Sequence, residues 1–143
     1  MPQTFALVAL LAVTAVIGAV WRARQGRVRV ARAAAPSAGD TSPATEWAAR
    51  GVILGTRATF LQLSAEICAP CRATARVLRA LASAEDGVAH QELDVDAHLD
   101  LVARLRVLTT PTVLVLDPDG VELARASGAM SPSQAREALA LCR

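Results

Sequence analysis

Hydrophobic and polar positions follow two different periods beyond residue 56, which predicts strands and helices in turn. Runs rich in apolar and β-branched residues predict strands at Ala58–Ser64, Val88–Val95, Thr112–Leu116 and Val121–Ser127. Apolar residues recurring every three or four positions predict helices over Cys68–Ser83 and Ala97–Arg106, and a capping-box sequence at Ser131 begins a third. The order β-α-β-α-β-β-α predicts an α/β fold with a mixed central sheet flanked by helices.

The first 21 residues differ, because their apolar positions are continuous rather than periodic. The uncharged segment 2–21, which includes FALVALLAVTAVIGAVW, is long enough for a helix across a hydrocarbon core of about 30 Å. We therefore expect a transmembrane anchor at residues 1–21. The alternatives are a buried core helix and a cleaved signal peptide. The missing polar stripe disfavours the first, and the missing basic residues ahead of the run disfavour the second.

Basic residues follow the apolar run at Arg22, Arg24, Arg27, Arg29 and Arg32. Short Arg-rich flanks stay on the cytoplasmic side, so we expect the domain in the cytoplasm, with the extracytoplasmic side as the alternative. We interpret residues 22–45 as an Arg-rich juxtamembrane segment and a flexible linker, because AAAPSAGDTSPAT is rich in proline and small residues. The folded domain is expected over residues 46–143.

Composition narrows the classes of function. The chain has 143 residues, a net charge of +2 and 3% aromatic residues, so no nucleic-acid partner is expected. Three cysteines are too few for a disulfide-stabilised scaffold, but Cys68 and Cys71 form a C-x-x-C pair. A zinc site would need two further ligands, and we expect no metal because the candidates lack a zinc-site spacing: Cys142, His90 and His98.

The sequence Cys68-Ala69-Pro70-Cys71 lies where a predicted strand gives way to a predicted helix. The free amide hydrogens at a helix N-terminus favour an anion, so we expect the pKa of Cys68 to be lower than that of a free cysteine. Cys71 lies one turn further on, within disulfide distance but deeper. An exposed thiolate that attacks and a shielded thiol that resolves suit thiol–disulfide exchange.

A second candidate feature is the proline that begins the Thr112–Leu116 strand. Pro111 cannot donate a hydrogen bond to the sheet, so its position requires a reason. A cis peptide after Thr110 would supply one by presenting the Thr110 backbone outward, and an ordinary trans proline is the alternative.

Together, the strand, C-x-P-C, helix, T-P-T, hairpin and final helix resemble the thioredoxin-like family over Thr56–Leu141. The resemblance implies a thioredoxin-like fold and a protein-disulfide oxidoreductase in which Cys68 attacks and Cys71 resolves. It also implies that Pro111 is the cis-proline and that Thr110, Pro111 and Gly128 border the substrate.

The chain departs from the family pattern near the cysteine pair. Ile67 stands where a tryptophan is usual, and Gln62 replaces a buried acid that accepts the proton of the resolving cysteine. Glu92, near the position of the usual lysine partner, is the candidate substitute for that acid. Ala69 and Pro70 are expected to tune the redox potential, and Cys142 is expected to be a partly buried or idle thiol.

We therefore expect a membrane-anchored thiol–disulfide oxidoreductase that reduces protein disulfides. Its partners would be a cysteine-containing protein substrate, a dithiol protein that exchanges electrons with it, and the membrane through residues 2–21. No metal or organic cofactor is expected, because the cysteine pair carries the electrons. The alternatives are an extracytoplasmic reductase of cytochrome-maturation type and a non-catalytic thioredoxin-fold module for docking or metal handling.

Overall fold

A computed structural model describes residues 2–24, 27–30 and 42–142 of the chain. Its elements, in chain order, are α1 (Pro2–Arg24), β1 (Val28–Val30), α2 (Pro43–Ala49), β2 (Ala58–Ser64), α3 (Ala69–Ala84), β3 (Val88–Asp94), α4 (Leu99–Arg104), β4 (Thr112–Leu116), β5 (Glu122–Ser127) and α5 (Pro132–Leu139). The strands predicted at Ala58–Ser64 and Thr112–Leu116 are confirmed with the expected bounds. The remaining predicted elements are present with ends shifted by a few residues.

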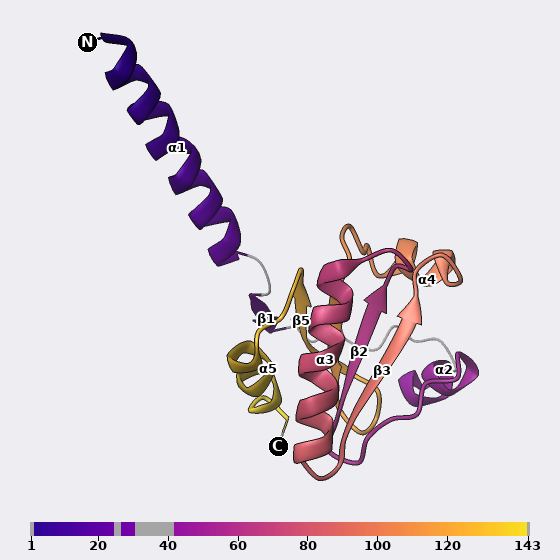
Figure 1. Ribbon diagram of the computed structural model, residues 1–143. Coiled ribbons are helices and arrows are strands. Elements are labelled where there is room, and N and C mark those ends of the chain that lie inside the picture. The colour runs from indigo at the N-terminus through magenta and orange to yellow at the C-terminus, as the bar shows by residue number, and fades with distance from the viewer. Residues whose placement is uncertain (1, 25–26, 31–41, 143) are drawn as a thin grey trace.

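The strands form one mixed sheet in the order β1-β5-β4-β2-β3 (Figure 1). β2 and β3 are parallel, whereas the pairs β2–β4, β4–β5 and β1–β5 are antiparallel. This arrangement confirms the expected mixed sheet. Because strand alternation sends successive side chains to opposite faces, each central strand contributes to two separate cores.

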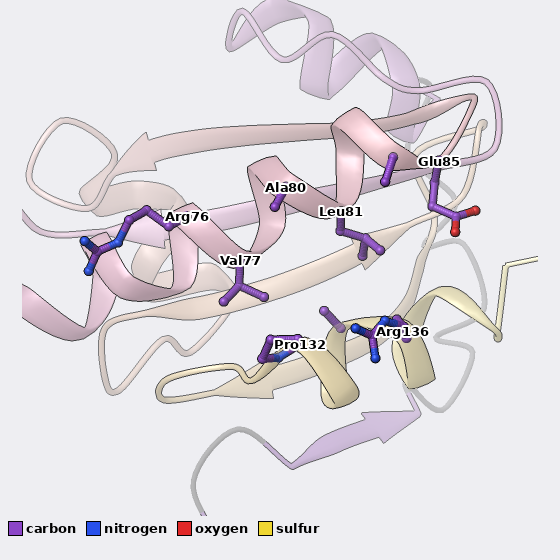
Figure 2. Close-up of a pocket in the computed structure, with 9 residues that line it drawn as sticks. Arg76, Val77, Ala80, Leu81, Glu85, Pro132 and Arg136 are labelled. Atoms are coloured by element: carbon purple, nitrogen blue, oxygen red, sulfur yellow. The ribbon is translucent and has the colours of Figure 1, made fainter.

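Helices cover both faces of the sheet (Figure 1). On one face, Phe60 and Val113 pack with Leu78 of α3 and Ala135 of α5. On the other face, helices α2 and α4 contribute residues to a core that also contains Leu61, Leu63, Leu114 and Leu116. Between α3 and α5 runs a groove of about 430 Å³, bordered by the exposed Arg76 and Arg136 (Figure 2).

The register brings the ends of four strands together at one end of the sheet. Leu63, near the end of β2, pairs with Thr112 at the start of β4, and Thr112 pairs with Ser127 at the end of β5. Val28, at the start of β1, pairs with Ala126. The segments that follow β2 and β5 and those that precede β4 and β1 therefore meet at this end of the sheet.

The domain begins earlier than the sequence pattern indicates. Residues 28–30, expected in the Arg-rich juxtamembrane segment, form the edge strand β1. Part of the expected linker is helical, because Ser42 caps α2 and Trp47 buries its ring, with Nε1 donating to the Gly120 carbonyl at 2.8 Å. Residues 31–41 of that linker lie outside the described residues.

Helix α1 is apolar and exposed over its described side chains, but it does not meet the criteria for a membrane span. Its side chains are described for residues 4–20, and all of these are exposed. Within the described part of the chain, no helix is long and apolar enough to cross a membrane. The transmembrane anchor expected at residues 1–21 is therefore not supported, and the described side chains of α1 form an exposed apolar surface.

Candidate active site

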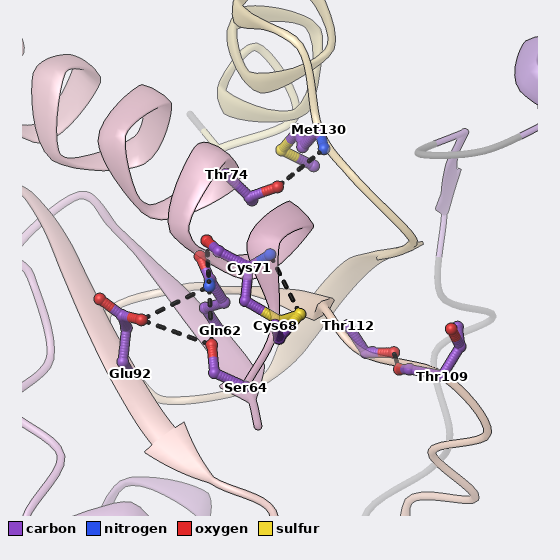
Figure 3. Close-up of a disulfide and its surroundings, with 9 residues drawn as sticks. All are labelled: Gln62, Ser64, Cys68, Cys71, Thr74, Glu92, Thr109, Thr112 and Met130. Carbon is purple, nitrogen blue, oxygen red and sulfur yellow. Dashed lines mark hydrogen bonds between the residues drawn. A yellow bond between two sulfur atoms is a disulfide. The ribbon is translucent and has the colours of Figure 1, made fainter. Parts of the chain in front are cut away.

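Cys68 and Cys71 form a disulfide at the end of the sheet where β2 terminates (Figure 3). Cys68 is the N-cap of α3, with extended backbone, and Cys71 lies in the first turn. The Cys68 Sγ accepts a hydrogen bond from the Cys71 backbone N–H at 3.1 Å. Capping normally uses a side-chain oxygen for this contact. Here a sulfur occupies the position where the helix N-terminus stabilises negative charge.

The two sulfurs differ less in exposure than the sequence pattern suggests. In the disulfide form Cys68 is 8% exposed and Cys71 is 2% exposed, so both are buried. Cys68 is the more exposed of the two cysteines, as expected, but it is buried and not openly exposed. The residues around it supply the exposed surface: Ala69 and Pro70 are exposed, and Ile67 has 94% of its surface accessible.

At the same end of the sheet as the disulfide, the Thr110–Pro111 peptide bond is cis. Of the cis and trans prolines considered from the sequence, the cis form is therefore the one present. The turn before β4 is closed by the Thr112 hydroxyl, which donates to the Thr109 carbonyl at 2.7 Å (Figure 3). Gly128 donates its backbone N–H to the Pro111 carbonyl at 2.8 Å and has a φ of 92°. A side chain at Gly128 would be strained in that conformation, which explains the glycine beside the proline. Substrate contacts by Thr110 and Gly128 stay a prediction.

A buried side-chain contact joins the loop after β5 to the helix that carries the cysteines. The Thr74 hydroxyl of α3 accepts a hydrogen bond from the Met130 backbone N–H at 3.1 Å (Figure 3). Thr74 and Met130 are both buried. This contact, which the sequence reasoning missed, holds the Gly128 loop against α3.

Gln62, in place of the buried acid of the family pattern, lies beside Cys71 (Figure 3). It is fully buried, and its Nε2 donates to the Cys71 carbonyl at 3.0 Å and to the Ser64 hydroxyl at 2.7 Å. Its Oε1 has no hydrogen-bond partner among the described residues. A buried carbonyl oxygen without a partner is costly, and this one lies beside the helix turn that contains Cys71.

Glu92 joins this cluster from the neighbouring strand. Its Oε2 lies 3.4 Å from the Ser64 hydroxyl and 3.5 Å from Gln62 Nε2. Its side chain is 39% exposed, and Arg79 lies 4.0 Å away. Glu92 is therefore separated from Cys71 by Gln62 rather than in the place of the missing acid. Ser64 was not singled out from the sequence, although strand alternation places it on the same face as Gln62.

We expect Glu92→Gln to change the rate of disulfide reduction by less than about twofold, because an amide can keep the contacts to Ser64 and Gln62. The measurement is the pH–rate profile of the variant against that of the natural chain. A larger loss that grows with falling pH would instead assign Glu92 the role of proton acceptor.

Cys142 is a free thiol buried at the C-terminal end of the domain. Burial raises the pKa of this thiol, so less thiolate is present at any given pH. We expect iodoacetamide to label Cys142 slowly in the folded chain and rapidly in denaturant, as measured by mass spectrometry. Rapid labelling in the folded chain would contradict this description of Cys142.

Comparisons with known proteins agree with this geometry. Residues 55–142 match the family described as thioredoxin-like domain. The chain is similar to a Fasciola hepatica thioredoxin, with 30% identity, a TM-score of 0.55, and coverage of 62% of this chain and 84% of that one. It is also similar to the chloroplastic thioredoxin z, with 28% identity, a TM-score of 0.55, and coverage of 66% and 83%.

A further solved structure shares the fold alone. The oxidised mitochondrial thioredoxin 3 of Saccharomyces cerevisiae has 24% identity and a TM-score of 0.52, with coverage of 59% of this chain and 78% of that one. No curated protein matches the chain.

Proposed function

This chain belongs to the thioredoxin-like domain family and is a thiol–disulfide oxidoreductase with a C-x-x-C pair, and we propose that it works as a reductant of protein disulfides. The observation that carries the proposal is the position of Cys68 at the N-terminus of α3. Its Sγ accepts the Cys71 N–H, and the same contact would stabilise a thiolate in the reduced form.

In the proposed reaction, the Cys68 thiolate attacks one sulfur of the substrate disulfide. The substrate S–S bond breaks, a Cys68–substrate disulfide forms, and the other substrate sulfur leaves as a thiolate. Cys71 then loses its proton and attacks the Cys68 sulfur, which releases the second substrate thiolate and closes the Cys68–Cys71 disulfide. Two electrons pass to the substrate, and an external dithiol returns them to the pair.

Apolar surface beside the cysteines supports a protein as the substrate. Ile67 directly precedes Cys68, and Leu108 lies two residues before Thr110 in the turn that leads to the cis-proline. Leu108 is 95% exposed, about as much as Ile67. Large apolar side chains with this exposure are suited to burial against a partner polypeptide.

The proposal is tested by insulin reduction. We expect the full-length chain, kept reduced by dithiothreitol, to accelerate the cleavage of the insulin interchain disulfides, followed as turbidity from the released chain. A rate equal to that of dithiothreitol alone would overturn the proposed function.

The compartment is part of the same proposal. We infer that the domain works on the cytoplasmic side, where protein thiols are kept reduced and a reductant of protein disulfides can be resupplied with electrons. A membrane-impermeant thiol reagent applied to intact cells should leave Cys68 unlabelled until lysis. Labelling without lysis would favour the extracytoplasmic alternative, including a reductase of cytochrome-maturation type.

A further inference from the structure

A small basic pocket lies beside strands β1 and β5, outside the site described above. Its volume is about 180 Å³, and we name it the arginine pocket after its lining residues, Arg27, Arg29, Arg125 and Ser127. The two arginines from the β1 segment are exposed, and Arg125 is partly buried. Among the described residues, no carboxylate lines this pocket, which distinguishes it from the groove between α3 and α5, where Glu85 lies.

The register places the pocket at the same end of the sheet as the disulfide. Ser127 pairs with Thr112, the residue after Pro111, and it directly precedes Gly128. Neighbouring strands lie about 4.8 Å apart, so β5 is about 10 Å and β1 about 14 Å from the line of β2. An extended polypeptide covers that distance in about three to five residues, at roughly 3.3 Å for each residue.

The charges around the pocket call for an anion. Arg29 and Arg125 lie directly opposite each other in the β1–β5 pair, and like charges in that arrangement repel. Glu122 binds Arg125 through two hydrogen bonds of 2.8 Å. Across the described chain, by contrast, no acidic group forms an ion pair with Arg29. A carboxylate brought by a partner would offset the repulsion and supply that missing pairing.

We propose that the arginine pocket binds an acidic side chain of the protein substrate, about three to five residues from the disulfide that is reduced. This inference rests on the proposed function and adds a substrate class to it, namely proteins with Asp or Glu near the target cysteines. Positioning by Arg29 would hold the substrate disulfide over Cys68 and raise kcat/KM without touching the reacting sulfurs.

The test uses two synthetic peptides with the same intramolecular disulfide. One has Glu four residues outside each cysteine, and the other has Gln at the same positions. With the full-length chain at low salt, we expect kcat/KM to be about fivefold higher for the Glu peptide, the size expected for one exposed ion pair. The preference should disappear in about 1 M salt, where the screening length is about 3 Å.

Variants locate the preference. Arg29→Gln should bring the ratio of the two kcat/KM values to about one, and Arg29→Glu should favour the Gln peptide, because the charge at the pocket is then absent or reversed. The matched control is Arg136→Glu, which makes the same charge change at an exposed arginine beside the α3–α5 groove (Figure 2). This control should keep the preference for the Glu peptide.

Each other outcome overturns the inference. Equal kcat/KM values for the natural chain, or a preference that survives Arg29→Glu, would show that the pocket does not select acidic substrates. If Arg29→Glu weakens binding to phosphatidylglycerol vesicles and leaves the peptide ratio unaltered, the pocket belongs to a lipid headgroup. Reduction of both peptides at equal rates leaves the proposed function intact, whereas reduction of neither overturns the function and the inference together.

Discussion

A Cys68→Ser variant is expected to lose disulfide reduction by about three orders of magnitude or more, because a serine hydroxyl does not ionise to replace the attacking thiolate. A Cys71→Ser variant is expected to stop one step later. Cys68 still forms the mixed disulfide, but no second thiol releases the substrate, so a covalent complex accumulates. Turnover with insulin measures the first effect, and non-reducing electrophoresis with mass spectrometry measures the second.

Cys142→Ser is the matched control for both variants, because it removes a buried thiol that lies outside the site. It should reduce insulin at the rate of the natural chain and should trap no substrate. Turnover by Cys68→Ser at a comparable rate would contradict the assignment of the attacking sulfur. Trapping through Cys71 in that variant would reverse the two roles.

A Phe60→Ala variant is expected to lower the free energy of unfolding by about 3–5 kcal/mol, as large-to-small substitutions in a packed core do. Phe60 is fully buried on β2, which lies between β4 and β3, and it belongs to the core beneath α3 and α5. A single domain is stable by only about 5–15 kcal/mol. Urea unfolding followed by circular dichroism measures the loss.

Ile53→Ala is the control for this substitution, because Ile53 is an exposed apolar residue of the same domain. Its effect should stay within about 0.5 kcal/mol. A Phe60→Ala variant as stable as the natural chain would contradict the packing described for that face of the sheet. An unchanged slope against urea concentration would show that the unfolded state is the same in both variants.

The elements that sequence reasoning predicted well are those whose own residues decide their structure. Ala58–Ser64 and Thr112–Leu116 are short, apolar and rich in β-branched residues, and no helical period competes with them. The N-terminus of α5 also follows from local chemistry, because Ser131 and Gln134 form the expected capping box.

The elements that it missed depend on partners far along the chain. The three residues of β1, Val-Arg-Val, alternate apolar and polar positions, but this run is too short to predict a strand by itself, and its pairing depends on the free edge that β5 offers. Helix α2 begins in a proline-rich segment typical of linkers, and the burial of Trp47 against Gly120 holds it to the domain. Tertiary contacts of this kind outweigh local composition.

The candidate site divides in the same way. The C-x-x-C spacing and Pro111 are visible in the sequence because each has a local chemical reason. The contact between Thr74 and Met130, by contrast, joins residues 56 positions apart, and no local pattern indicates it. The buried environment of Cys68 likewise depends on loops that pack around it and not on its own segment.

The anchor of Trp47 has a consequence for spectroscopy. Gly120 follows β4, whereas Cys68 lies beside the start of that strand, so the indole and the sulfurs occupy opposite ends of the sheet. The emission of Trp47 should therefore respond to loss of the folded domain and remain nearly constant when the cysteine pair is oxidised or reduced. In a Trp21→Phe variant, whose single tryptophan is Trp47, fluorescence would then follow denaturation without interference from the redox state of the sample.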